Sequence, residues 1–369
     1  MIALKKLIDE HNISSAQFIK RFKEITAENM SKASLSLLLN GGKELKKIPD
    51  FKAKIAKTYN SLTKENKSIN ELFEIEQQEE NMIESINLTY DELKHFGLSR
   101  DPFMPFITKE SDIVMLDSHH YALEMMRAAR DTGQFTVITS EVGGGKTTVL
   151  GKFEAETKNL SDCIIVKVRT KDMDRCTTKD ILAACVFDLS DDKPKRGAES
   201  LSRQVEALLK KHHDAGKRII LIIDEAQDLH THTLKYLKRL WELRDGLTPL
   251  VGIILIGQTE LATRLYSDNN LAVREVTART IHAPLEPINE SLKDYIAGKV
   301  KCVKGDYTKI ITDDAIAALS DMLTLKDANK KQIYKAYPLD VNNRIKRLMK
   351  LAYEQGERVI TKEFMEEMA

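Results

Sequence analysis

The chain has 369 residues, which is more than one ordinary hydrophobic core holds and enough for two or three domains. It is 42% hydrophobic and 31% charged, with a net charge of +1, which excludes a uniformly basic protein that coats nucleic acid. Its four cysteines show no zinc-like spacing, and the sequence shows no signal peptide and no apolar run long enough to cross a bilayer. We therefore expect a soluble cytoplasmic protein with no membrane partner.

Charge divides the chain into three zones. Residues 1–60 carry 12 Lys and Arg against 6 Asp and Glu, whereas residues 61–95 carry 3 Lys against 9 Asp and Glu. The remainder is mixed in charge and contains almost all the glycine and proline. We predict a small basic domain at 1–60, an acidic linker at 61–95, a core at 96–288 and a helical domain at 289–369.

The basic zone is expected to form short helices. Ser14 or Ser15 can cap a helix whose apolar positions include Phe18 and Phe22, and Ser31 can cap a second that ends at the Asn40-Gly41-Gly42 signal. Another helix follows Pro49. The first two segments predict a helix-turn-helix, although the segment between them is longer than the usual tight turn.

The core zone alternates short apolar runs with longer helical patterns. The runs lie at 135–139, 163–168, 218–223, 251–256 and 280–285. Helical patterns lie near 147–157, 178–189, 197–215 and 231–244. Continuous β-branched runs that alternate with helices predict an α/β fold in which a parallel sheet is covered on both faces. From about residue 289 the pattern is only helical, which predicts an α-helical lid.

A phosphate-binding loop is predicted where the first run meets the first helical pattern. The segment 140–148 reads SEVGGGKTT, in which Ser140 replaces the usual first glycine. Backbone N–H groups in such a loop wrap phosphates, a lysine binds the β- and γ-phosphates, and a hydroxyl binds Mg²⁺. The expected ATP-binding residues are Glu141, Val142, Gly143, Gly144, Gly145, Lys146, Thr147 and Thr148.

Polar residues at two other strand ends complete the predicted site. Asp224 follows an apolar strand and can hold Mg²⁺ together with Thr147, while Glu225 can polarise the attacking water. Gln258 follows the next apolar strand and can orient that water against the γ-phosphate. Arg274 and Arg279 precede the last strand, from which an arginine can reach a neighbouring subunit's γ-phosphate.

These motifs together resemble a family. The stretch from HFGLSRDPF at residues 95–103 to IGQTEL at 256–261 resembles the P-loop AAA+ ATPases that include the ExeA-type secretion ATPase and the target-selecting ATPases of DDE transposons. The small N-terminal helix-turn-helix joined to such a core is similar in layout to transposition proteins of the phage Mu B type. One departure is that Leu339 stands where the family often has a lid arginine that senses phosphate. Either Arg344 or Arg347 substitutes for it, or the lid does not touch the nucleotide.

The resemblance implies an ATP-dependent, double-stranded-DNA-binding ATPase that assembles with itself as a filament or ring, delivers target DNA to a transposase, and disassembles on hydrolysis. The alternatives are a secretion-type assembly ATPase, a regulator in which ATP is a structural ligand, and a relative of replication initiators or helicase loaders. Candidate DNA contacts lie in the predicted second helix and in the core, with a protein-interaction domain and ordinary surface charge as the respective alternatives. They are Lys32, Ser34, Ser36, Lys171, Arg175, Lys235 and Lys238.

Overall fold

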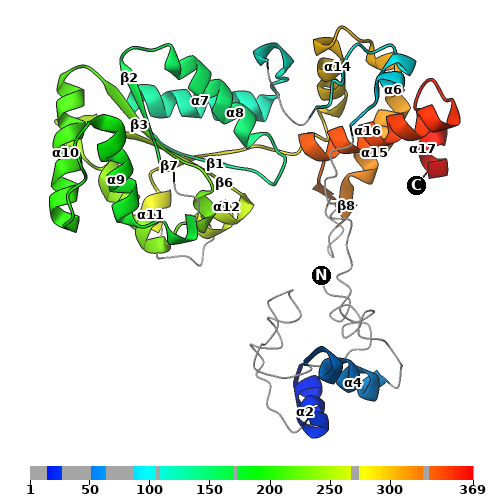
Figure 1. The fold of residues 1–369 in the computed structure, drawn as a ribbon, viewed down its shortest axis with the longest axis horizontal. Coiled ribbons are helices and arrows are strands. Elements are labelled where there is room, and N and C mark those ends of the chain that lie inside the picture. The colour runs from blue at the N-terminus through cyan, green and yellow to red at the C-terminus, as the bar shows by residue number, and fades with distance from the viewer. Residues whose placement is uncertain are drawn as a thin grey trace. The chain divides into compact units, whose positions relative to one another are not determined.

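The computed structural model describes residues 15–26, 51–63, 87–104, 109–169, 173–266, 274–326 and 332–368. The chain divides into two compact units, Met1–Ser85 and Ile86–Ala369, and each is described by itself (Figure 1).

The described part of the N-terminal unit consists of two helices. They are α2 (Ser15–Thr26) and α4 (Phe51–Thr63), and both were predicted. Phe18 and Phe22 of α2 and Ile55 and Tyr59 of α4 are fully buried, because each helix repeats its apolar residues on one face. The predicted helix at Ser31 lies outside the described residues.

The second unit is built on a five-stranded parallel sheet. Its strands are β1 (Phe135–Thr139), β2 (Cys163–Lys167), β3 (Arg218–Ile223), β6 (Gly252–Gly257) and β7 (Thr280–Pro284). They lie in the order β2-β3-β6-β1-β7, so the first strand is inserted between the last two. The predicted α/β class and all five strands are confirmed.

Helices cover both faces of this sheet (Figure 1). One face packs on α9 (Thr178–Leu189), α10 (Ala198–Asp214), α11 (Thr231–Trp241) and α12 (Thr259–Tyr266). The other face packs on α7 (Asp117–Thr132) and α8 (Lys146–Lys158). Successive residues of a strand serve opposite faces: Leu221 joins the first cluster, and Ile220 and Ile222 join the second. Burial on both faces explains why the strands read as continuous apolar runs.

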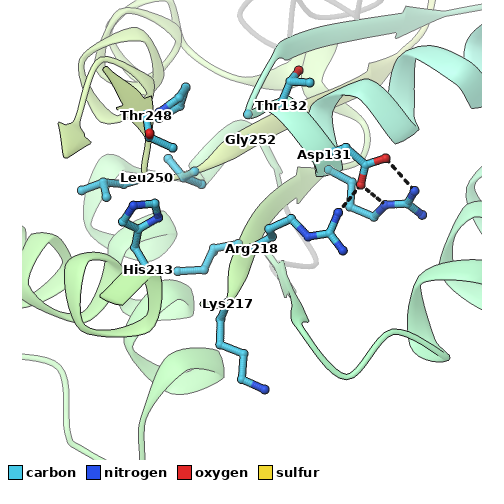
Figure 2. A pocket seen from close by; sticks show the side chains of 13 residues that line it. Asp131, Thr132, His213, Lys217, Arg218, Thr248, Leu250 and Gly252 are labelled. Carbon is cyan, nitrogen blue, oxygen red and sulfur yellow. Dashed lines mark hydrogen bonds and ion pairs between the residues drawn. The ribbon is translucent and has the colours of Figure 1, made fainter. Parts of the chain in front are cut away.

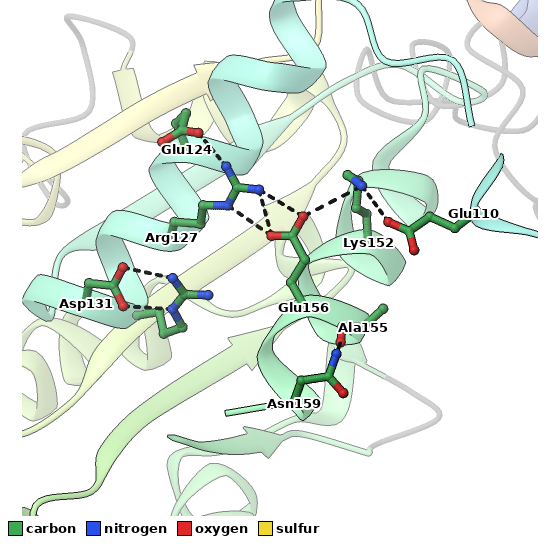
Figure 3. Close-up of polar contacts among 9 residues, drawn as sticks. Glu110, Glu124, Arg127, Asp131, Lys152, Ala155, Glu156 and Asn159 are labelled. Carbon is green, nitrogen blue, oxygen red and sulfur yellow. Dashed lines mark hydrogen bonds and ion pairs between the residues drawn. The ribbon is translucent and has the colours of Figure 1, made fainter. Parts of the chain in front are cut away.

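Helix α7 was not among the predicted elements. Arg127 on α7 donates from Nε and one terminal nitrogen to the Glu156 carboxylate on α8, at 2.8–2.9 Å. Lys152 of α8 in turn donates to Glu110 at 2.7 Å (Figure 3). This polar row joins the two helices along their outer sides, above the apolar face that packs on the sheet.

Short elements complete the core. The 3₁₀ helices are η1 (Glu110–Asp112), η2 (Met173–Arg175) and η3 (Ala226–Asp228), and α13 (Arg274–Thr277) precedes β7. Helix α11 ends at Trp241, earlier than predicted, because β4 (Arg244–Asp245) and β5 (Thr248–Pro249) pair as a hairpin. Its turn contains Gly246 at φ 60°, a left-handed conformation that glycine adopts without strain.

The remaining elements form the lid. Its helices are α14 (Leu292–Cys302), η4 (Tyr307–Lys309), α15 (Asp313–Met322), α16 (Pro338–Gln355) and α17 (Lys362–Met368). The prediction of a purely helical pattern here is wrong, since β8 (Thr324–Lys326) and β9 (Gln332–Tyr334) form an antiparallel pair. Three-residue strands are too short to show a period of two.

The segment before the core also packs on the lid. Helix α6 (Tyr90–His95) begins with a capping box between Thr89 and Glu92. Leu93, Phe96 and Phe103 then enter the same apolar cluster as the lid helices. The segment that precedes the sheet in the sequence and the lid helices that follow it therefore share one apolar cluster.

Candidate functional site

The predicted phosphate loop lies at the carboxyl end of β1 and leads directly into α8. Helix α8 begins at Lys146, so its N-terminal N–H groups face the loop, where they favour an anion. Val142, at the tip, is 59% exposed, whereas Ser140, at the base, is buried. The loop is therefore held at its base and open at its tip.

Three successive glycines let this loop adopt its path. Gly143 and Gly145 have φ values of 79° and 97°, which side-chain-bearing residues rarely adopt. A Cβ on Gly144 would lie 1.7 Å from Ser140 Oγ, and one on Gly145 would lie 2.7 Å from His119 Nε2. The sequence GGG is thus required by backbone shape and by space.

Ser140 supports the assignment of a phosphate site, despite its departure from the usual glycine. Its hydroxyl is buried beneath the loop and has no hydrogen-bond partner among the described residues. A buried hydroxyl without a partner is costly, and a phosphate oxygen or the rearranged loop can satisfy it. The donor set of the loop therefore fits a phosphate group.

Lys146 is directed at the loop itself. Its Nζ donates to the carbonyl oxygens of Ser140 at 2.8 Å and Glu141 at 3.1 Å. Burial lowers the pKa of Lys146, and the nearby carboxylates of Glu225 and Asp224 oppose that shift. The ammonium is thus already placed over the loop, between the phosphate-binding backbone and the acidic pair.

His119 of α7 holds the loop from below. Its Nε2 donates to the carbonyl of Gly144 at 3.0 Å, and its Nδ1 accepts from the N–H of Leu116 at 3.3 Å. One donating and one accepting nitrogen define the neutral imidazole. Burial lowers the pKa of His119, which keeps the ring in that neutral form. This role could not be predicted from the sequence, because α7 itself was not predicted.

The acidic pair lies at the end of β3. The Glu225 N–H donates to Asp224 Oδ1 at 2.9 Å, and Glu225 adopts a left-handed backbone with φ 51°. Desolvation raises the pKa of Asp224, and the Glu225 charge adds to this effect against the hydrogen bond from the Glu225 N–H. Among the described residues no three His, Cys, Asp or Glu form a metal cluster. A single carboxylate and the Thr147 hydroxyl suit Mg²⁺, which retains waters and phosphate oxygens as its other ligands.

Gln258 lies directly after β6, beside the end of β3. Its neighbour Thr259 donates through Oγ1 to Glu141 Oε1 at 2.9 Å, which links the phosphate loop to the start of α12. Gln227, two residues after Glu225, donates to the Glu225 carboxylate at 2.7 Å. Thr259 and Gln227 were not predicted as site residues, although both closely follow residues that were.

The lid touches the phosphate loop through Leu339. The N–H of Leu339, in the first turn of α16, donates to the Gly143 carbonyl at 3.2 Å. A Cβ on Gly143 would lie 2.5 Å from Leu339 Cβ, so the phosphate loop and the first turn of α16 are in close contact. The residue that replaces the expected lid arginine therefore contacts the loop through its main chain and its apolar side chain. Arg344 and Arg347 are exposed on the same helix.

Arg279 lies far from the phosphate loop of its own chain. It immediately precedes β7, whose first residue Thr280 pairs with Phe135 at the amino end of β1. The loop follows the carboxyl end of β1, and five strand residues span about 16 Å. Arg279 pairs with Glu242 at 3.7 Å. Arg274 is the first residue of α13.

The candidate DNA-binding residues are only partly described. Lys32, Ser34, Ser36 and Lys171 lie outside the described residues. Arg175 and Lys235 are exposed. Lys238 is 18% exposed and pairs with Glu242 at 3.5 Å, at the end of α11. Arg175 and Lys235 thus remain accessible candidates.

A small pocket lies at the end of the sheet opposite the phosphate loop, where β1, β3 and β6 begin (Figure 2). Arg130 and Arg218 line it, and both pair with Asp131. Lys217 donates to the Ser161 carbonyl at 2.6 Å. These basic groups are already paired within the chain, and none of the predicted site residues lies there.

Comparison with known proteins agrees with this geometry. Residues 129–265 match the family model of the AAA domain, a range that contains the loop, the acidic pair and Gln258. Together with the sheet order and the lid, the fold is that of a P-loop AAA+ protein, as predicted. The chain is 31% identical over 235 residues to general secretion pathway protein A of Aeromonas hydrophila, which covers 61% of this chain and 40% of that protein.

Solved structures to which the chain is similar include Cdc6p from Pyrobaculum aerophilum, at 17% identity and a TM-score of 0.45 over 70% of this chain and 67% of that chain. They also include the RuvB Holliday junction branch migration motor of Thermotoga maritima, at 14% identity and a TM-score of 0.39 over 70% of both chains.

Across the described parts of the chain, no helix combines the length and apolar character needed to span a bilayer.

Proposed function

We propose that the chain binds ATP with Mg²⁺ at residues 140–148 and hydrolyses it. The observation that carries this proposal is the glycine loop between β1 and α8, with Lys146 above it and Asp224 and Glu225 at the end of β3, which β6 separates from β1. Loop amides, a lysine and two acids are the parts that phosphoryl transfer to water requires.

Each residue has a distinct task in this proposal. On ATP binding, Lys146 exchanges the carbonyls of Ser140 and Glu141 for phosphate oxygens. Thr147 and Asp224 would hold Mg²⁺, which would neutralise charge on the phosphates. Glu225 accepts a hydrogen bond from the attacking water, and Gln258 orients that water toward the γ-phosphate.

The site is completed by a second copy of the chain. Arg279 lies at the amino end of β7 and cannot reach the loop of its own chain, so it would act on a neighbour's nucleotide. Assembly would then depend on ATP, and hydrolysis would release the subunits from one another.

We propose that this nucleotide cycle serves an assembly step in a secretion pathway. The identity to general secretion pathway protein A supports this alternative over the transposition role expected from the sequence layout. The match covers 40% of that relative, so the activity of the whole relative is not assigned to this chain.

The test begins with ATP turnover by the full chain and by Glu225→Gln. Glu206→Gln, on the exposed face of α10, is the matched control. We expect turnover in the wild type and control and its loss in Glu225→Gln, with ATP binding retained. Equal turnover in all three would refute the role of Glu225.

The cellular role is tested on the same proteins. Binding to random-sequence duplex DNA is measured with ATP, ADP and no nucleotide, alongside fractionation of the host cell. Association with the secretion apparatus without ATP-dependent DNA binding supports the secretion role. ATP-dependent filaments or rings on DNA would overturn it and return the transposition role to first place.

A further inference from the structure

The side chain of Gln227 bridges the ends of two neighbouring strands. Its Nε2 donates to Glu225 Oε2 at 2.7 Å, and its Oε1 accepts the main-chain N–H of Gln258 at 3.0 Å. Glu225 follows β3 and Gln258 follows β6, and these strands are adjacent in the sheet. One amide therefore contacts both the proposed water-activating group and the proposed γ-phosphate sensor.

The orientation of this amide is fixed by its partners. A main-chain N–H can only donate, so the atom facing Gln258 must be the oxygen. A carboxylate can only accept, so the atom facing Glu225 must be the amino group. Both bonds are made only when Gln227 is turned in this direction.

Gly257 provides the space for this bridge. A Cβ at Gly257 would lie 2.8 Å from Gln227 Oε1 and 2.8 Å from Leu261 Cδ2. The φ of Gly257 is not in the left-handed region, so backbone freedom does not require a glycine here. The requirement at this position is room for the Gln227 amide.

Arg264 holds the main chain of the same residue. From α12 it donates to the carbonyls of Gln227 and Leu229, both at 2.6 Å. The segment after β3 is therefore attached to the helix that follows Gln258. Side-chain and main-chain contacts of Gln227 both connect the acidic pair to the β6 side of the site.

This attachment acts on a residue in an unfavourable conformation. Glu225 has φ 51° and ψ 39°, a left-handed backbone that side-chain-bearing residues seldom adopt without surrounding support. The hydrogen bond from Gln227 fixes the carboxylate of this residue. Displacing that bond would let the carboxylate turn away from the position of the water.

We propose that Gln227 is a positioning residue that couples Glu225 to the main chain at Gln258, so that contact with the γ-phosphate at one strand end sets the carboxylate at the other. This inference rests on the proposed ATP hydrolysis. Gln227 makes its contacts with protein groups, and it acts on the reaction through Glu225.

Gln227→Leu removes both hydrogen bonds at nearly constant size. We expect kcat to fall by about 10- to 100-fold, because misplacing a reacting group costs that order of rate. The dissociation constant for ATP should stay unchanged, because Gln227 does not contact the loop. An unchanged kcat, or a loss explained by weaker ATP binding, overturns the inference.

Gln227→Glu provides a readout that a merely structural role would not move. The new carboxyl group can donate to Glu225 and accept from Gln258 only while it is protonated. The ionised form cannot donate to Glu225, so kcat should fall while the dissociation constant for ATP stays unchanged. A kcat equal to that of the wild type contradicts the coupling.

Gly257→Ala tests the same contact from the end of β6. It replaces Gln227→Leu as the test variant if Gln227→Leu does not fold. Its methyl group enters the space of the Gln227 amide, so kcat should fall while ATP binding remains. If wild type and Glu225→Gln show equal turnover, the proposed hydrolysis itself has failed. If Glu225→Gln is inactive while Gln227→Leu and Gly257→Ala keep wild-type kcat, only this inference has failed.

Discussion

The main-chain N–H of Leu339 donates to the carbonyl of Gly143 across the boundary between lid and core, at 3.2 Å. Leu339 lies in the first turn of the long lid helix α16, whereas Gly143 lies in the phosphate loop. A rearrangement of the loop around a phosphate therefore acts directly on the lid. The contact needs no arginine, because the lid meets the loop through the main chain of Leu339.

Gly143→Ala should disrupt this contact. The new methyl group would lie 2.5 Å from Leu339 Cβ, and the φ of 79° is strained for any residue with a side chain. A left-handed residue costs about 1–2 kcal/mol before the collision is counted. We expect a lower melting temperature in differential scanning calorimetry and a smaller increase on adding ATP.

Gly151→Ala is the matched control for that substitution. Gly151 lies in α8, has no atom within 4 Å of its would-be Cβ and has no positive φ. Alanine inside a helix is more stable than glycine by about 0.5–1 kcal/mol, so this variant should melt at a higher temperature. If both variants melt alike, the contact between loop and lid does not constrain the protein.

Lys146→Ala should weaken ATP binding. On binding, the ammonium exchanges two loop carbonyls for phosphate oxygens, and one hydrogen bond to a charged group contributes about 1.5–3 kcal/mol. We expect at least a tenfold loss of affinity, and about 100-fold at the upper value, in equilibrium binding of a fluorescent ATP analogue. Lys158→Ala, at the exposed end of the same helix, should bind as the wild type does. Equal affinities of Lys146→Ala and the wild type for ATP would show that the nucleotide does not bind at this loop.

His119→Gln should change how stability depends on pH. Burial lowers the pKa of His119 below its usual 6.5, so the unfolded chain binds a proton here at a higher pH than the folded chain does. The wild type therefore loses stability as the pH falls below about 6.5, and this residue contributes no pH dependence above that range. Gln keeps a donor and an acceptor but does not titrate.

The measurement is the melting temperature at several pH values between about 5 and about 8. The curve for His119→Gln should fall less steeply toward acid than that of the wild type. The burial of His282 also lowers its pKa, so some slope remains in the variant as well. A slope identical in both proteins would mean that His119 titrates alike in the folded and unfolded chains.

The sequence predicted the sheet well because its central strands β1, β3 and β6 are buried along almost their whole length and read as apolar runs. The motif residues of the site could also be predicted, since Asp224 and Gln258 directly follow such runs and Lys146 ends the glycine loop that follows the first run. Helix α7 was missed, although its C-terminal end is marked by Gly133 in a left-handed conformation. The hairpins β4–β5 and β8–β9 were missed because strands of two or three residues carry no periodic signal.

Contacts made by tertiary packing could not be predicted in the same way. His119 reaches Gly144 across 25 residues of sequence, and Thr259 reaches Glu141 across 118. Nothing in the local pattern around either residue indicates a phosphate loop. Gln227 is intermediate: its place directly after the acidic pair is visible in the sequence, but its bond to the Gln258 main chain depends on the order of strands.

Mixing two inactive variants tests whether Arg279 acts between subunits. Arg279→Ala keeps the loop and the acidic pair, whereas Lys146→Ala keeps the arginine. If the arginine of one subunit completes the site of the next, an assembly of both variants contains some complete sites. We expect each variant alone to be inactive, with Arg279→Ala reduced by about 10³-fold or more, and the mixture to regain part of the turnover.

Arg203→Ala, on the exposed face of α10, is the control and should turn over ATP as the wild type does, alone or mixed. The mixture must be assembled with ATP present, because Lys146→Ala enters an assembly only through its neighbour's nucleotide. A mixture no more active than the sum of its parts, with both proteins shown to co-assemble, would assign Arg279 to its ion pair with Glu242 within one chain. Recovery above that sum would instead place the catalytic unit at the contact between two copies.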